Sequence, residues 1–228
     1  MPKKNSSALL ATALIVTGGL LGSLPASASV IVLDFEGAGD LAQLLDFYNG
    51  GTDSQGNSGT DYDIQFGSNA LTIIDSDAGG SGNFANEPSP DTTLFFLTGS
   101  AILNYALGFD TGFSFFYSSS TAATVNVYDG LNATGNLLAS LNLNAQFSNN
   151  CSGDPNGDFC NWTPVGVTFT GIAKSIDFGG TVNQTGYDDI TFGSATPGGG
   201  TSVPEPASLA LLGIGLAGLG FTRRRKRA

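Results

Sequence analysis

Short stretches of alternating apolar and polar residues run through the middle of the chain. Val125 and Val127, for example, alternate with Asn126 and Tyr128. Similar stretches occur at residues 113–117, 141–144, 165–170, 176–178 and 190–192. A period of two indicates strands with one buried face and one solvent-exposed face. Clusters of Asp, Asn, Thr and Gly lie between these stretches and indicate turns. The pattern predicts an all-β body, an antiparallel jelly-roll-like β-sandwich.

Three other segments of the body break this pattern. Leu41–Leu45 is a short helix candidate, with Asp40 before it as a possible N-cap. Residues 49–62 and 78–92 are long and polar, and loops of that length in a compact domain are commonly functional or mobile. We expect the sandwich to occupy residues 29–193. A stretch rich in Gly, Ser and Thr follows at 194–202 and predicts a flexible linker.

The N-terminal end has the features of a secretory signal. A basic start, Met1–Lys4, precedes an apolar run from Ala8 to Leu24, and small residues follow at Pro25–Ser29. This order predicts a signal peptide at residues 1–28, with an N-terminal signal helix that signal peptidase removes after Ala28. The alternative is an uncleaved membrane helix, which the short, glycine-containing run disfavours.

The C-terminal end combines a proline-rich motif, an apolar run and a basic tail. The motif is Val203, Pro204, Glu205 and Pro206, and the tail is Arg223, Arg224, Arg225, Lys226 and Arg227. The run between them, Ala207–Phe221, is shorter than the roughly 20 residues of a comfortable membrane span. We expect a short C-terminal hydrophobic helix, a transmembrane helix that halts export with its basic end in the cytoplasm. A plain stop-transfer anchor is the alternative.

These three elements in this order resemble the PEP-CTERM sorting signal, here at residues 203–228. Tails of this kind are also called ice-binding protein C-terminal domains, a name that describes the tail and not the body. The resemblance implies an exosortase as partner, an integral membrane protease-transpeptidase that sorts the protein and processes it near the triplet. It therefore implies an exported protein, transiently anchored in the membrane and destined for the cell surface or the extracellular space.

The charge of the body excludes one class of partner. Between residues 29 and 202, Lys174 is the only basic residue against eighteen acidic ones, which gives a net charge of about −17. Nucleic-acid binding is excluded because phosphate contacts need Lys and Arg. Docking on anionic lipid is disfavoured for the same reason.

Several kinds of catalytic and metal site are also excluded. The chain has no histidine, which removes the usual Ser-His-Asp and Cys-His triads and His-based zinc sites. Cys151 and Cys160 are the only cysteines, and in an exported protein they predict a disulfide. The loop between them holds Asp154, Asn156 and Asp158, which suits a rigid solvated turn better than a calcium loop.

The two ends of the body suggest a structural calcium site. The opening Leu33–Gly37 and the closing Gly186–Phe192 resemble the first and last strands of MAM-like and carbohydrate-binding jelly rolls. That resemblance implies that the two strands pair and that acidic residues at their ends hold calcium. The residues it nominates are Asp34, Glu36, Asp188 and Asp189. The alternative is ordinary acidic strand ends.

Aromatic residues beside the polar loops are candidates for stacking on an extracellular polysaccharide. They are Tyr48, Tyr62, Phe84 and Trp162, each of which has core packing as its alternative role. No pair of carboxylates stands out for glycoside hydrolysis. The sequence therefore favours a non-catalytic surface or extracellular-matrix protein over a carbohydrate-binding module, and either over a secreted hydrolase.

Overall fold

The computed structural model describes residues 30–149, 151 and 157–198 of the 228-residue chain. Eleven β-strands and no α-helix occur in this part. The strands form two sheets in which neighbouring strands run antiparallel, so the predicted all-β, antiparallel class is confirmed. The expected signal helix at 1–28 and the hydrophobic helix of the tail lie outside the described residues.

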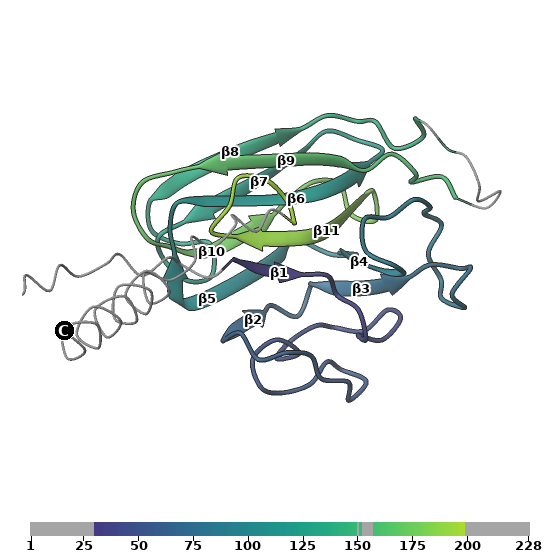
Figure 1. Ribbon diagram of the computed structural model, residues 1–228, viewed down its shortest axis with the longest axis horizontal. Helices are drawn as coiled ribbons and strands as arrows, with labels where there is room; N and C mark the ends of the chain where they lie inside the picture. The colour runs from purple at the N-terminus through teal and green to yellow at the C-terminus, as the bar shows by residue number, and fades with distance from the viewer. Residues whose placement is uncertain (1–29, 150, 152–156, 199–228) are drawn as a thin grey trace, which may run out of the picture.

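The first sheet has six strands. They are β1 (Ile31–Leu33), β3 (Leu71–Ile74), β4 (Thr92–Phe95), β6 (Gly112–Ser119), β9 (Thr163–Thr168) and β11 (Thr185–Phe192). Their order is β3-β4-β11-β6-β9, and β1 also pairs with β11. Figure 1 shows β9, β6, β11 and β1 following one another across this sheet.

The second sheet has five strands. They are β2 (Ile64–Phe66), β5 (Ala101–Phe109), β7 (Ala123–Tyr128), β8 (Leu137–Leu143) and β10 (Ala173–Phe178). Their order is β2-β5-β10-β7-β8. The six stretches with a period of two all fall on strands of one sheet or the other, β6 to β11, which confirms the alternation as a strand signal.

A single aromatic-rich core lies between the two sheets. Phe115 of β6 and Tyr187 of β11 contact Phe178 of β10 in the other sheet, with ring centroids 5.9 and 4.9 Å apart. All three side chains are fully buried. Tilted and edge-to-face contacts of this kind add to the stability that burial provides.

The first and last strands pair, as the resemblance to jelly rolls implies. Residues Ile31–Leu33 of β1 lie opposite Ile190–Phe192, while β4 meets β11 earlier, at Tyr187. β1 and β4 therefore share one edge of β11 and leave a gap between them. A β-bulge in β11 falls at this gap, between Asp188 and Thr191.

The predicted helix at Leu41–Leu45 is wrong. Leu41 and Leu45 have positive φ values of 55° and 46°, outside the right-handed helical region. The reason lies in Asp40, whose carboxylate accepts hydrogen bonds from the backbone N–H of Ile74, at 3.0 Å, and of Ser81 instead of capping a helix. Contacts distant in sequence thus override the local signal.

The polar loop at residues 49–62 is organised around a buried carboxylate. Asp53 accepts hydrogen bonds of 2.8 to 2.9 Å from the N–H groups of Gly39, Gln55 and Asn57 and from the Asn57 side chain. Burial raises the pKa of Asp53, but these four hydrogen bonds outweigh burial and lower the pKa below its ordinary value. The Asp53 carboxylate therefore holds the turn at residues 53–57, and backbone hydrogen bonds such as that from Gly59 N–H to the Phe47 carbonyl oxygen hold the rest of the loop.

Candidate functional site

A small hollow opens on the outward face of the six-stranded sheet. Its floor is made by β4 and β11, where Thr93 alternates with the core residue Leu94 and so faces away from the core. Its walls come from two loops, around Phe84 and around Phe159–Trp162. The hollow has a volume of about 40 Å³, enough for about three water-sized groups.

Trp162 and Phe84, two of the four aromatic residues that the sequence nominates, meet at this hollow. Their rings lie edge to face with centroids 6.2 Å apart. The indole Nε1–H of Trp162 donates a 3.1 Å hydrogen bond to the carbonyl oxygen of Ala85, which fixes the ring. Gly186 lies beneath, where a Cβ atom would come within 3.0 Å of Trp162 Cη2. The absence of a side chain at 186 therefore keeps the base of the hollow open.

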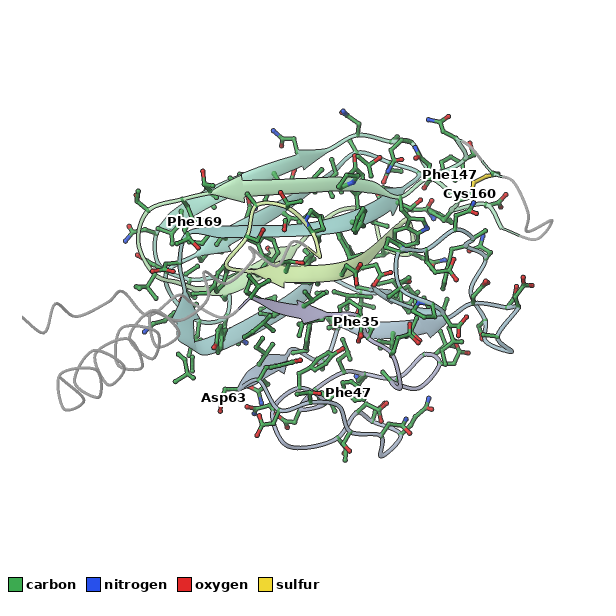
Figure 2. All side chains as sticks on the ribbon, in the orientation of Figure 1. Phe35, Phe47, Asp63, Phe147, Cys160 and Phe169 are labelled. Carbon is green, nitrogen blue, oxygen red and sulfur yellow. A yellow bond between two sulfur atoms is a disulfide. The ribbon has the colours of Figure 1, made fainter. Side chains whose placement is uncertain are left out.

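The predicted disulfide between Cys151 and Cys160 is present beside this wall, with Cα atoms 5.1 Å apart. The two residues just before Cys160 pair with the loop around Phe84. The backbone N–H groups of Asp158 and Phe159 donate to the carbonyl oxygen of Asn83 at 2.8 and 3.2 Å. Figure 2 shows Cys160 and Phe147 at one end of the sheets and Phe169 at the other. Asp154 and Asn156 lie outside the described residues.

Polar groups without protein partners surround the hollow. Thr93 is only 1% exposed, and its hydroxyl forms no hydrogen bond within the described part of the chain. At the rim, the side-chain amides of the exposed residues Asn83 and Asn183 likewise bond to no described residue. A buried hydroxyl without a partner costs free energy, which a ligand hydroxyl could recover.

The other two nominated aromatics lie away from the hollow. Tyr48 is a core residue, 3% exposed, whose hydroxyl accepts a 2.8 Å hydrogen bond from the N–H of Phe35. Tyr62 is partly buried and stacks on Tyr48 with centroids 6.1 Å apart. Tyr48 therefore has no exposed face on which a ligand could stack, and core packing accounts for both rings.

The four acidic residues nominated for calcium lie around the gap between β1 and β4. Glu36 accepts hydrogen bonds from the N–H groups of Asp91 and Thr92 at 3.0 and 2.8 Å. Asp189 is half-buried in the bulge with a φ of 48°. Burial first, and then the charges of Asp34 and Glu36, raise its pKa. The structure thus brings the four residues into one neighbourhood.

Asp188, fully buried in this neighbourhood, is enclosed by hydrogen bonds. Ser89 N–H donates to its Oδ2 at 2.9 Å, and Asp189 N–H donates to its Oδ1 at 2.7 Å. Ser89 Oγ lies 2.7 Å from Asp188 Oδ1 and 3.0 Å from the carbonyl oxygen of Asp34. The Ser89 hydroxyl is the donor in both contacts. Burial raises the pKa of Asp188 to about 8, even though the hydrogen bonds from the Ser89 N–H, the Ser89 hydroxyl and the Asp189 N–H oppose the shift.

These hydrogen bonds leave few carboxylate oxygens for a metal ion. Glu36 and Asp188 are occupied by protein donors, and calcium takes six to eight oxygen ligands. Within residues 30–149, 151 and 157–198, no group of three or more acidic or cysteine side chains is arranged to hold a metal ion. Calcium binding therefore stays a prediction, and the bonds of Glu36 and Asp188 count against it.

Sequence reasoning misses the floor of the hollow. The sequence does not nominate Thr93 or Gly186 for a ligand site, and they come together with Trp162 only because β4, β11 and a distant loop meet. The nominated sorting residues, Val203 to Pro206 and Arg223 to Arg227, lie outside the described residues. Within the described ranges, no helix has the length and hydropathy needed to cross a membrane.

Comparison with known families identifies the C-terminal end of the chain. Residues 202–226 match the PEP-CTERM protein-sorting motif. This match confirms the resemblance of the tail, and the motif implies an exported protein that an exosortase sorts. No curated protein sequence matches the chain.

Three solved structures resemble parts of the body. A glycoside hydrolase family 43 arabinoxylan arabinofuranohydrolase from Bacillus subtilis is 16% identical over 55% of this chain, with a TM-score of 0.37, and the match spans only 24% of that enzyme. A family 6 carbohydrate-binding module is 16% identical over 44% of this chain and 72% of its own, with a TM-score of 0.31. The K2 cleaved adhesin domain of Lys-gingipain is 10% identical over 72% of this chain and 99% of its own, with a TM-score of 0.45. We infer no function from likenesses of this size.

Proposed function

We propose that this chain, whose residues 202–226 form a PEP-CTERM protein-sorting motif, is a non-catalytic cell-surface or extracellular-matrix protein with a jelly-roll-like body. The observation that carries the proposal is the match of that motif. An exosortase would recognise the tail while its apolar run, Ala207–Phe221, holds the chain in the membrane, and would process it near Pro204-Glu205-Pro206. The body would then be displayed outside the cell or released.

The chemistry of the body supports a role without catalysis. The chain has no histidine to serve as a general base near neutral pH. Asp188, the carboxyl group with the pKa suited to a general acid, is fully buried and hydrogen-bonded to Ser89. A glycosidase needs its acid at a cleft, where it can reach a glycosidic oxygen. A secreted hydrolase is therefore the weakest of the three candidates.

A carbohydrate-binding module is the second candidate, and one specific observation favours it. The hollow beneath Trp162 joins aromatic walls to polar groups that have no partner among the described residues, an arrangement typical of ligand sites. Surface display and polysaccharide binding are compatible, since adhesive surface proteins do both.

Localisation in the host tests the first proposal. We would compare the wild-type chain with a variant carrying Ala at Pro204, Glu205 and Pro206, in cells with and without their exosortase. The wild type should reach the surface or medium only when the exosortase is present, and the triple variant should stay in the membrane fraction. An Arg-to-Lys exchange at Arg224 keeps the basic tail and serves as a matched control. Equal surface display of all forms would refute the proposal.

A further inference from the structure

We propose that the hollow between Trp162, Thr93 and Gly186 binds the edge of an uncharged sugar ring. The inference deepens the second candidate function and rests on it. It is independent of the sorting motif, because the hollow belongs entirely to the described part of the body.

The size of the hollow sets how a ligand can enter. A volume of about 40 Å³ admits about three water-sized groups, which is too little for a whole pyranose ring. A hydroxyl or hydroxymethyl group fits this space. The ring that carries the group would then lie across the rim, with its apolar C–H face against Trp162 or Phe159.

The floor offers a hydrogen-bonding group that the protein does not use. Thr93 Oγ1 is buried and without a partner in the described chain, and it lies within 3.6 Å of the position of a Cβ atom at Gly186. A sugar hydroxyl that reaches the floor would complete this bond. At the rim, the amides of Asn83 and Asn183 can both donate and accept, as recognition of several hydroxyl groups requires.

Charge restricts the ligand to uncharged saccharides. None of the described residues that line the hollow is charged. Lys174, the only basic residue between residues 29 and 202, lies on β10 in the other sheet. A body with eighteen carboxyl groups repels uronates and sulfated sugars, and no guanidinium or ammonium group near the hollow offsets that repulsion.

The walls are held in place before any ligand arrives. Backbone hydrogen bonds join Asp158 and Phe159 to Asn83, and Ala85 to Phe159, at 2.8 to 3.2 Å. The disulfide at Cys160 follows directly, and Trp162 is fixed by its bond to Ala85. Walls that need no reordering reduce the entropic cost of binding.

Tryptophan fluorescence tests the proposal directly, because Trp162 is the only tryptophan in the chain. The exported chain would be titrated with neutral oligosaccharides of cellulose, xylan, mannan and starch, and with an oligogalacturonate as the anionic probe. We expect a saturable change in Trp162 emission with at least one neutral probe at up to millimolar concentration. The oligogalacturonate should give none.

Thr93→Val separates ligand binding from folding. The exchange keeps the shape of the side chain and removes a hydroxyl that has no described partner, so the melting temperature should hold or rise. Affinity for the bound sugar should fall about threefold to tenfold, the effect of one hydrogen bond. Thr121→Val is the matched control, since Thr121 also has a buried unpartnered hydroxyl but does not line the hollow. Its affinity should equal that of the wild type.

Gly186→Ala tests whether the ligand binds in the hollow itself. Its Cβ atom would come within 3.0 Å of Trp162 Cη2 and occupy the base of the hollow, so binding should be lost. Three outcomes would overturn the proposal: no response to any neutral probe, a response to the oligogalacturonate alone, or unchanged affinity in Thr93→Val. Normal surface display of the same chain would show that such a failure concerns the hollow and not the sorting signal.

Discussion

Replacing Asp188 by Asn tests whether this buried carboxyl group carries a proton in the folded protein. The side chain lies in the gap between β1 and β4, fully buried beside Ser89. Asn cannot titrate but has nearly the same shape. The charged or titratable groups that act on this place are Asp189 from β11, Asp34 and Glu36 from the segment after β1, and Tyr48.

The size and sign of the effect follow from the pKa of Asp188. Burial raises it from 3.8 to about 8, so between about pH 4 and pH 8 the folded state binds one more proton than the unfolded state. The stability that this proton contributes is fully present below about pH 4 and is lost as the pH rises through about 8. From about pH 5 to pH 7 the loss is on the order of 3 kcal/mol, since each pH unit is worth about 1.4 kcal/mol. For a domain of this size, that lowers the melting temperature by roughly 5–10 °C.

Urea unfolding at both pH values measures the effect. The wild type should have a lower free energy of unfolding at the higher pH, and Asp188→Asn should lose on the order of 3 kcal/mol of that pH difference. The variant should also be destabilised by about 1–3 kcal/mol at the lower pH, because the Asn amide cannot accept both N–H donors. Asp110→Asn, at an exposed aspartate, is the control and should keep the wild-type difference. If Asp188→Asn keeps the wild-type pH difference too, Asp188 is ionised throughout this range and its raised pKa is wrong.

Three further predictions concern other parts of the body. Cys151→Ser with Cys160→Ser should lower stability to thermal unfolding by about 2–3 kcal/mol, and an unchanged melting temperature would show that the bridge constrains little. Asp53→Ala should cost about 2–3 kcal/mol in urea unfolding at neutral pH, because its loop loses an ionised acceptor, and the cost should shrink in acid as the wild-type carboxylate is protonated. If Asp34, Glu36, Asp188 and Asp189 hold calcium, the melting temperature should rise in millimolar calcium, and equal melting temperatures in calcium and in chelator would refute this site.

The sequence predicts a strand where one face of that strand is exposed to solvent. β7 and β9 alternate in burial along their whole length, and the sequence shows it. β4 does not alternate, since all four residues of Thr92–Phe95 are buried, the outward ones beneath loops. The polar loop predicted at 78–92 ends where β4 begins, and the sequence carries no strand signal for β4 itself.

The candidate site was predictable only in part, for a related reason. Trp162 and Phe84 stood out as aromatics beside polar loops, but Tyr48 in the same kind of position belongs to the core. The residues next to them in the sequence do not distinguish an aromatic ring at the hollow from one in the core. The bond from Trp162 to Ala85 spans 77 residues of sequence, and the floor at Thr93 and Gly186 comes from two more segments. The sequence predicts that the first and last strands pair, but it does not predict the hydrogen bonds that occupy Asp188.

The intact mass of the mature protein tests the central claim, that this chain is a sorted surface protein. The protein would be isolated from the surface and the medium of a host that has the exosortase, and its intact mass would be measured by mass spectrometry. The account predicts a species that has lost the basic tail, Arg223 to Arg227, through processing near Val203-Pro204-Glu205-Pro206. A final product that still carries Arg223 to Arg227 would contradict it.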